Sequence, residues 1–110
     1  MNRVLFVCGK NRWRSPTAEQ LFAETPGIEC LSAGLSHDAE TRLSRELVEW
    51  ADTIFVMERV HLTKLRAQFH TDLTGKKVVN LAIPDRYSYM DPDLVRLLLQ
   101  KMKPYLCKLR

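Results

Sequence analysis

An uninterrupted apolar run, Val4-Leu5-Phe6-Val7, stands near the beginning of the chain. A run that does not alternate with polar residues is typical of a strand buried on both faces, as in a parallel sheet covered by helices. Residues 53–57 repeat this pattern, and further strands are predicted at 28–33, closed by Gly34, and at 78–83. The fully buried strands favour a layered α/β fold.

Segments with helical spacing follow the predicted strands. The first helix is predicted to begin with Ser15 as N-cap and Pro16 at the first helical position, and to end at Pro26-Gly27. The last begins at Asp91-Pro92, again an N-cap followed by proline, and Pro104 is expected to kink or end it. Its predicted inward face carries Leu94, Val95, Leu98, Leu99 and Met102. The remaining helices are predicted at 44–51 and 59–69.

This alternation indicates a three-layer α/β sandwich with a central four-stranded, mostly parallel sheet. A length of 110 residues, 45% of them hydrophobic, fits one domain over residues 1–110. In this architecture ligands normally bind at the carboxyl ends of the strands. No apolar run approaches the roughly 18 residues of a membrane helix, so no membrane partner is expected.

Charge and cysteine content exclude several further classes. A net charge of +4 is an ordinary solvated balance, so no nucleic-acid partner is expected. The three cysteines, Cys8, Cys30 and Cys107, are widely spaced and odd in number, which predicts reduced thiols in a cytoplasmic protein. No metal or other cofactor is predicted, because His37, His61 and His70 lack the spacing of metal ligands and are expected at the surface or at helix ends.

The segment from Cys8 to Ser15 carries the candidate chemistry. Cys8 directly follows a predicted buried strand, and Arg14 stands six positions later at the mouth of a helix. Backbone N–H groups of a loop that curls into a helix N-terminus bind anions such as phosphate. The same field favours the thiolate form of Cys8, a nucleophile, and the planar fork of Arg14 suits the oxygens of a phosphoryl group in transfer.

The stretch Val4-Leu5-Phe6-Val7-Cys8-x5-Arg14-Ser15-Pro16-x-Ala18-Glu19 resembles the low-molecular-weight protein tyrosine phosphatases. Residues 32–34, 54–61 and 83–85 also resemble segments of this family. The resemblance implies the phosphotyrosine phosphatase I-like fold, with flavodoxin-like topology. It also implies metal-free hydrolysis of phosphate monoesters through a phosphocysteine. A phosphotyrosine protein or a small aryl phosphate would then be the substrate and inorganic phosphate the product, while the oligomeric state stays open.

Carried over by resemblance, Cys8 is the nucleophile, Arg14 the phosphate clamp, Ser15 the hydroxyl that steadies the thiolate and Asn11 the residue that orders the loop. Tyr87 falls where an aromatic wall normally lines the substrate slot. The other residues expected to contact substrate are Gly9, Lys10, Arg12 and Trp13.

Expulsion of the leaving group needs a proton donor, and two carboxyl groups follow the fourth predicted strand. We favour Asp85, which has no evident structural duty, although Arg86 replaces the proline that the family has after its acid. Asp91 is explained by its place as an N-cap, yet the family writes its acid as Asp-Pro, so both remain candidates.

Some positions depart from the family pattern. The chain lacks a segment that the family usually has after the strand ending in Gly34, which we expect to trim one wall of the site. Trp13 occupies the place of a second cysteine, so no disulfide within the loop is expected. Lys10 replaces a glycine and, with Arg12, either favours substrates with acidic neighbours or simply adds solvated charge.

Two other functions compete with the phosphatase. A noncatalytic module for phosphate or phosphoprotein would use Arg14 and the loop amides without turnover, which leaves Cys8 and a plausible acid unexplained. An arsenate reductase on the same fold needs two further cysteines to pass oxidation outward, and no cysteine lies between Cys30 and Cys107. The phosphatase is therefore the leading hypothesis.

Overall fold

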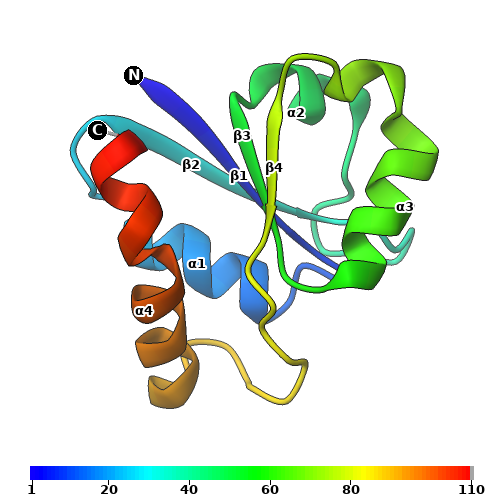
Figure 1. Ribbon diagram of the computed structural model, residues 1–110. Helices are drawn as coiled ribbons and strands as arrows, with labels where there is room; N and C mark the ends of the chain where they lie inside the picture. Colours follow the sequence, from blue (N-terminus) through cyan, green and yellow to red (C-terminus); the bar gives the residue numbers. More distant parts are fainter. Residues whose placement is uncertain (110) are drawn as a thin grey trace.

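A sheet of four parallel strands forms the centre of the protein in a computed structural model that describes residues 1–109 (Figure 1). The order of the strands across the sheet is β2-β1-β3-β4. Their bounds are β1 Asn2–Cys8, β2 Ile28–Gly34, β3 Thr53–Val56 and β4 Lys77–Asn80. The predicted parallel sheet, with the strand order of a doubly wound fold, is confirmed.

Helices cover both faces of this sheet. Helices α1 (Arg14–Phe22) and α4 (Pro92–Leu109) lie on one face (Figure 1). On the other face lie α2 (Arg45–Trp50), α3 (Arg59–Phe69) and the short 3-10 helix η1 (Thr71–Leu73). The predicted three-layer α/β sandwich is therefore confirmed.

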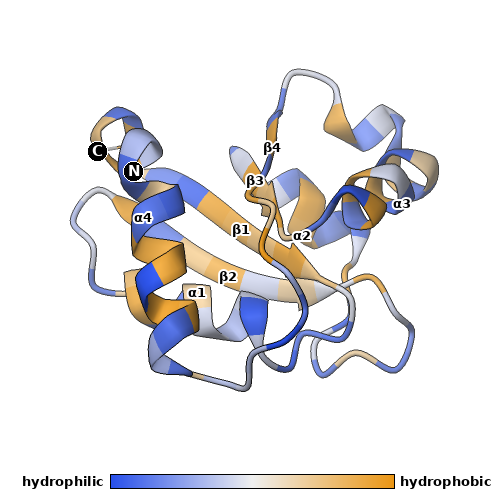
Figure 2. Ribbon diagram, turned by 60° about the horizontal axis from the view of Figure 1, so that its bottom comes forward, coloured by the Kyte–Doolittle hydropathy of each residue, from blue (hydrophilic) through white to orange (hydrophobic). Residues whose placement is uncertain are grey.

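Strand β1 explains why the core has two halves. Val4 and Phe6 belong to one apolar cluster, with residues of α1 and α4, and Leu5 and Val7 belong to the other, with residues of α2 and α3. All four side chains are fully buried, and Figure 2 shows the hydrophobic β1 enclosed between the helical layers. A strand with no exposed face has no need of polar positions, which accounts for the lack of alternation in its sequence.

The first helix departs from the prediction at both ends. It begins at Arg14, with Trp13 as N-cap and no side-chain cap, and it ends at Phe22, before Pro26. Ser15 lies buried in the first turn, so its predicted role as N-cap is wrong. Its hydroxyl instead forms a hydrogen bond with the sulfur of Cys8.

The fourth strand is shorter than predicted. It ends at Asn80, because Ala82 adopts a positive φ of 55° that a strand does not accommodate. The chain nevertheless stays at the edge of the sheet, since Leu81 N donates to Val56 O and Ile83 N donates to Met57 O. This irregular path carries Asp85 toward the carboxyl end of β3.

The last helix starts as predicted and continues further. Asp91 caps it by accepting a hydrogen bond from Asp93 N. The helix runs through Pro104 to Leu109, so of the two effects expected of Pro104, a kink or an end, the end is wrong. Tyr105 packs edge-to-face on Phe55, with ring centroids 5.4 Å apart, and this contact holds the final turn on the core. Leu99 was expected inside but is 46% exposed. Among residues 1–109, no helix has both the length and the apolar character to cross a membrane.

Gly34 allows the close approach of two backbone segments at the end of β1. A Cβ at this position would stand 2.6 Å from Gly9 O, 2.6 Å from Ala39 Cβ and 3.0 Å from Asn11 N. Gly34 also exchanges backbone hydrogen bonds with the returning chain, donating to Thr41 O and accepting from Leu43 N. No larger residue fits here without moving the loop after Cys8.

We predict that Gly34→Ala destabilises the protein by about 2 kcal/mol, because the backbone of the loop after Cys8 and the Cβ of Ala39 would have to move. The matched control is Gly9→Ala, since a Cβ on Gly9 would meet only His61 Nε2, at an ordinary 3.8 Å. Urea unfolding of both variants measures the difference. Equal stability of the two variants would contradict the close contact at Gly34.

Candidate active site

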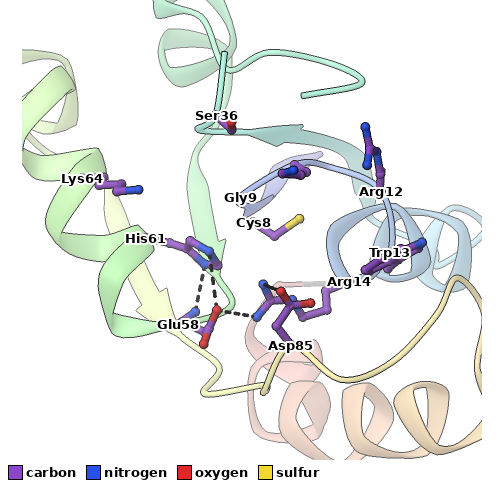
Figure 3. Close-up of a pocket in the computed structure, with 11 residues that line it drawn as sticks. Cys8, Gly9, Arg12, Trp13, Arg14, Ser36, Glu58, His61, Lys64 and Asp85 are labelled. Carbon is purple, nitrogen blue, oxygen red and sulfur yellow. Dashed lines mark hydrogen bonds and ion pairs between the residues drawn. The ribbon is translucent and has the colours of Figure 1, made fainter. Parts of the chain in front are cut away.

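The candidate site lies where the strand order reverses, at the carboxyl ends of β1 and β3. The loop after β1, the residues after β3 and the segment after β4 meet around a cavity of about 440 Å³ (Figure 3). The cavity is lined by Cys8, Gly9, Lys10, Arg12, Trp13, Arg14, Ser36, Glu58, His61, Lys64 and Asp85. The structure therefore brings most of the predicted site residues together.

The backbone of the loop after Cys8 is arranged for an anion. Three consecutive carbonyl groups point away from the cavity and accept hydrogen bonds from the segment 35–40: Cys8 O from Leu35 N at 3.0 Å, Gly9 O from Ser36 N at 2.9 Å and Lys10 O from Glu40 N at 3.0 Å. Within residues 1–109, the N–H groups from Gly9 to Arg12 donate to no carbonyl or side chain. Loop N–H groups in this arrangement form an anion-binding nest.

Asn11 fixes the shape of this loop. It is buried and has a positive φ of 55°, a conformation that asparagine tolerates better than most residues. Its Oδ1 accepts a hydrogen bond from Thr41 N, which leaves Nδ2 to donate to Ser15 Oγ and to Ser32 Oγ, each at 2.9 Å. Asn11 thus combines the two roles considered for it, a turn residue and a residue that orders the loop.

The sulfur of Cys8 receives a directed hydrogen bond. Cys8 Sγ lies 2.9 Å from Ser15 Oγ. Because Ser15 Oγ already accepts from Asn11 Nδ2, its own hydrogen is available for the sulfur. The sulfur thus faces a hydroxyl donor and lies close to the N-terminus of α1. The geometry matches what nucleophilic catalysis by Cys8 requires.

The Arg14 guanidinium is buried beneath the cavity and is held on one side. Its Nη1 donates to Glu58 Oε2 at 2.8 Å and to Ile83 O at 2.9 Å, and its Nη2 lies 3.7 Å from Asp85 Oδ2. The side chain is only 6% exposed, whereas that of Asp85 is 56% exposed. Asp85 therefore lines the cavity from its solvent-exposed side.

Glu58 and His61 are site residues that the sequence analysis did not identify. They are the first and fourth residues of a capping box at the start of α3, in which His61 Nδ1 accepts from Glu58 N at 3.1 Å. Of the two places expected for His61, a helix end is correct, because it lies in the first turn of α3, and the surface is wrong, because it is 4% exposed. A helix start directly after a buried strand was the available signal, since such a start adjoins the carboxyl edge of the sheet.

His61 is uncharged at neutral pH. Burial, and secondarily the positive charge of Arg14, lower the pKa of His61 from its usual 6.5 to about 4. Since Nδ1 accepts a hydrogen bond, the proton of the neutral ring is on Nε2, which lies 3.7 Å from Glu58 Oε2.

The remaining predicted residues have mixed outcomes. Tyr87 packs against the core, with Arg86 over its ring, and is not among the residues that line the cavity. Asp91 caps α4 and also lies outside the lining. Trp13 does line the cavity and is 46% exposed.

The two extra cations of the loop each face an acid. Lys10 Nζ lies 3.5 Å from Asp38 Oδ2, and Arg12 Nε lies 3.5 Å from Glu40 Oε1, with all four side chains largely exposed. These pairs favour the interpretation of Lys10 and Arg12 as solvated charges.

No group of three or more potential metal ligands occurs among residues 1–109.

Comparison with known proteins confirms the resemblance and the fold. Residues 3–53 match the family model described as low molecular weight phosphotyrosine protein phosphatase. No curated protein matches the chain.

Three solved structures illustrate the likeness in fold. The tyrosine phosphatase Wzb from Escherichia coli K30, in complex with phosphate, is 24% identical with a TM-score of 0.79, and the match covers 99% of each chain. Vibrio vulnificus Wzb in complex with benzylphosphonate is 21% identical with a TM-score of 0.81, covering 98% of this chain and 99% of the other. The YwlE arginine phosphatase from Geobacillus stearothermophilus is 21% identical with a TM-score of 0.72, and the match covers 100% of this chain and 98% of the other.

The lowered pKa of His61 predicts a pH-dependent stability. Between pH 6.5 and 4 the unfolded chain binds a proton at this histidine that the folded chain does not, so this group destabilises the fold as the pH falls. The full effect is up to roughly 3 kcal/mol. Urea unfolding at pH 7 and pH 4.5 measures it. The difference between the two pH values should be smaller in His61→Gln than in the native chain, and equal differences would contradict a neutral buried His61.

Proposed function

We propose that the chain hydrolyses phosphate monoesters, because it is similar to the low molecular weight phosphotyrosine protein phosphatases in sequence over residues 3–53 and to the solved phosphatase structures in fold over nearly its whole length. The observation that carries this proposal is the pairing of Cys8 Sγ with a hydroxyl donor, 2.9 Å away, beneath a loop of free N–H groups. Those N–H groups and Arg14 bind the phosphoryl oxygens. The sulfur then lies on the side from which a nucleophile attacks.

The reaction proceeds in two steps. The Cys8 thiolate attacks phosphorus, an S–P bond forms, and the P–O bond to the leaving group breaks as Asp85 donates a proton to the departing oxygen. Asp85 then accepts a proton from water, whose oxygen attacks the phosphocysteine. Inorganic phosphate and the Cys8 thiolate are released. The exposed position of Asp85 beside Arg14 supports its role as this acid and base.

Aryl phosphates, including phosphotyrosine, are the proposed substrates. The half-exposed indole of Trp13 stands on the cavity wall and offers a flat apolar face for an aromatic ring. Proteins with this fold include a tyrosine phosphatase and an arginine phosphatase, so the fold alone does not distinguish the P–O bond of phosphotyrosine from the P–N bond of phosphoarginine. Phosphotyrosine and phosphoarginine peptides of otherwise identical sequence are therefore the informative pair of substrates, with faster hydrolysis of the phosphotyrosine peptide expected.

The arsenate reductase alternative loses support. Cys30 forms a hydrogen bond with Phe22 O, and burial raises the pKa of its thiol to about 11. Cys107 is exposed on α4. Neither cysteine lines the cavity that contains Cys8, so neither is placed to pass oxidation outward.

Substitution of the nucleophile tests the proposed reaction. We predict that the native chain hydrolyses p-nitrophenyl phosphate in the presence of a metal chelator, and that Cys8→Ser abolishes turnover while still binding inorganic phosphate. A serine hydroxyl is a far weaker nucleophile, but the loop N–H groups and Arg14 remain. Release of nitrophenolate and phosphate calorimetry are the two measurements. Turnover that survives in Cys8→Ser would disprove the phosphocysteine, and phosphate binding by a native chain without turnover would support the binding module.

A second pair of variants tests the general acid. Asp85→Asn should lower kcat by about 100-fold, and more for phenyl phosphate than for p-nitrophenyl phosphate, because a poor leaving group depends more on the proton. Asp91→Asn is the matched control, since asparagine is also a good N-cap and Asp91 lies outside the cavity. Equal losses in the two variants would overturn the assignment of Asp85.

A further inference from the structure

A carboxylate lies against the phosphate clamp from the side of α3. Glu58 Oε2 accepts a hydrogen bond from Arg14 Nη1 at 2.8 Å and lies 3.7 Å from His61 Nε2 (Figure 3). The side chains of Arg14 and His61 are almost fully buried, whereas that of Glu58 is 38% exposed. Glu58 therefore reaches a buried guanidinium while keeping part of its carboxylate in water.

This contact opposes phosphate binding if charge alone is considered. A phosphate ester brings negative charge to Arg14, and a carboxylate beside the same guanidinium repels it and offsets part of the positive charge. Asp85 adds a second carboxylate 3.7 Å from the guanidinium. Glu58 therefore does not increase the affinity for phosphate through its charge, and its position beside Arg14 must have another function.

This function follows from which N–H groups of Arg14 already have a hydrogen-bond acceptor. Both hydrogens of Nη1 are occupied, one by Glu58 Oε2 and one by Ile83 O. The opposite edge of the guanidinium, formed by Nε and Nη2, is left to form the paired hydrogen bonds that a phosphoryl group accepts. Two fixed bonds on one nitrogen also prevent rotation of the planar group.

We propose that Glu58 is a positioning residue that holds Arg14 with its Nε–Nη2 edge toward the phosphoryl group, and that His61 holds Glu58 in place. The proposal rests on the proposed function, because it assigns the purpose of a bond to the clamp of that same site. Its physical content is preorganisation, in which a hydrogen bond made before the substrate arrives reduces the cost of orienting Arg14.

His61 supports Glu58 without adding charge. Its Nδ1 binds the backbone N–H of Glu58, and its Nε2 lies 3.8 Å from the position that a Cβ on Gly9 would occupy. The ring thus packs between the start of α3 and the loop after Cys8, called the phosphate loop below. At the fourth position of a capping box, glutamate is the common residue. Here it would add a third carboxylate near the phosphate, which the neutral imidazole avoids.

The competing explanation is that Glu58 merely occupies Arg14 and is displaced by substrate. The two explanations predict opposite effects of Glu58→Ala on the affinity for inorganic phosphate, measured by titration calorimetry. Positioning predicts a loss of about tenfold, comparable to the loss of other supporting partners in preorganised sites. Competition predicts stronger binding. Unchanged or stronger binding would overturn the proposal.

A double-mutant cycle separates positioning from general damage. In Arg14→Lys the ammonium has no fork to orient, so Glu58→Ala should cause little further loss of phosphate affinity in that background. Equal losses in both backgrounds would overturn the proposal.

Variants of His61 need a control of their own. His70→Gln is the matched control, because His70 is an exposed histidine at the end of α3 and lies outside the lining of the cavity.

Two variants of His61 test its part. His61→Gln keeps an acceptor for Glu58 N and should bind phosphate within about threefold of the native chain, whereas His61→Leu removes the acceptor and should weaken binding about tenfold. Thermal unfolding in the absence of phosphate checks that each variant folds. If His61→Leu folds and binds phosphate like the native chain, the supporting role of His61 is overturned.

Phosphate binding keeps this test distinct from that of the proposed function. If the native chain binds phosphate but turns over no ester, the proposed function fails while the Glu58 measurement still decides the positioning role. If turnover depends on Cys8 and Glu58→Ala has no effect on either kcat or phosphate affinity, the positioning role alone fails. Where both hold, Glu58→Ala should lower kcat at least as much as it lowers affinity, because Arg14 contacts the phosphoryl oxygens most strongly in the transition state.

Discussion

The backbone contact between the end of β1 and the turn after β2 is the interaction on which the candidate site depends. Because Gly34 has no Cβ, the segment 35–40 comes close enough to bind three consecutive carbonyl groups of the loop after Cys8. Because the carbonyl groups of this loop are directed at segment 35–40, its N–H groups are left to face the cavity. The anion nest is thus a consequence of how two parallel strands end at the same level, with Cys8 paired to Gly34.

The electrostatics of the cavity follow from local geometry more than from the net charge of +4. The loop cations Lys10 and Arg12 face Asp38 and Glu40 in exposed pairs, which contribute little in water. The buried groups have the larger effect: a single guanidinium, the N-terminus of α1 and the loop N–H groups, all in a partly dehydrated place where fields are stronger. The carboxylates beside that guanidinium therefore also affect the cavity more than the exposed pairs do, although they reduce its positive charge.

The sequence predicted the parts of the fold that depend on local pattern. The apolar runs of β1 and β3, the cap at Asp91 and the bounds of α3 were all recognisable, because burial on two faces, capping and helical spacing leave signals within a few residues. The cysteine and arginine of the loop were recognisable for the same reason.

The parts that failed depend on contacts between distant segments. The local pattern makes Ser15 an N-cap, and only the family resemblance pointed to its contact with Cys8. His61 was placed at the surface or at a helix end, and its burial against the loop after Cys8 becomes apparent only in the fold. Tyr87 follows the family pattern in sequence, yet in the fold it packs on the core. No local spacing reports such contacts, so sequence reasoning located the site but did not identify Glu58 and His61 as part of it.

The placement of Trp13 and of the segment after β4 shows how the two sides of the cavity are joined. Trp13 O accepts hydrogen bonds from Thr17 N and Thr17 Oγ1, so the first turn of α1 fixes the residue that forms the apolar wall. Thr17 Oγ1 also accepts from Met90 N, which ties the chain that follows Asp85 to the same helix turn. The wall, the phosphate loop and the anchor of the acid segment therefore share one turn of α1. A change at Thr17 would be felt at both sides of the cavity, although its buried side chain does not line it.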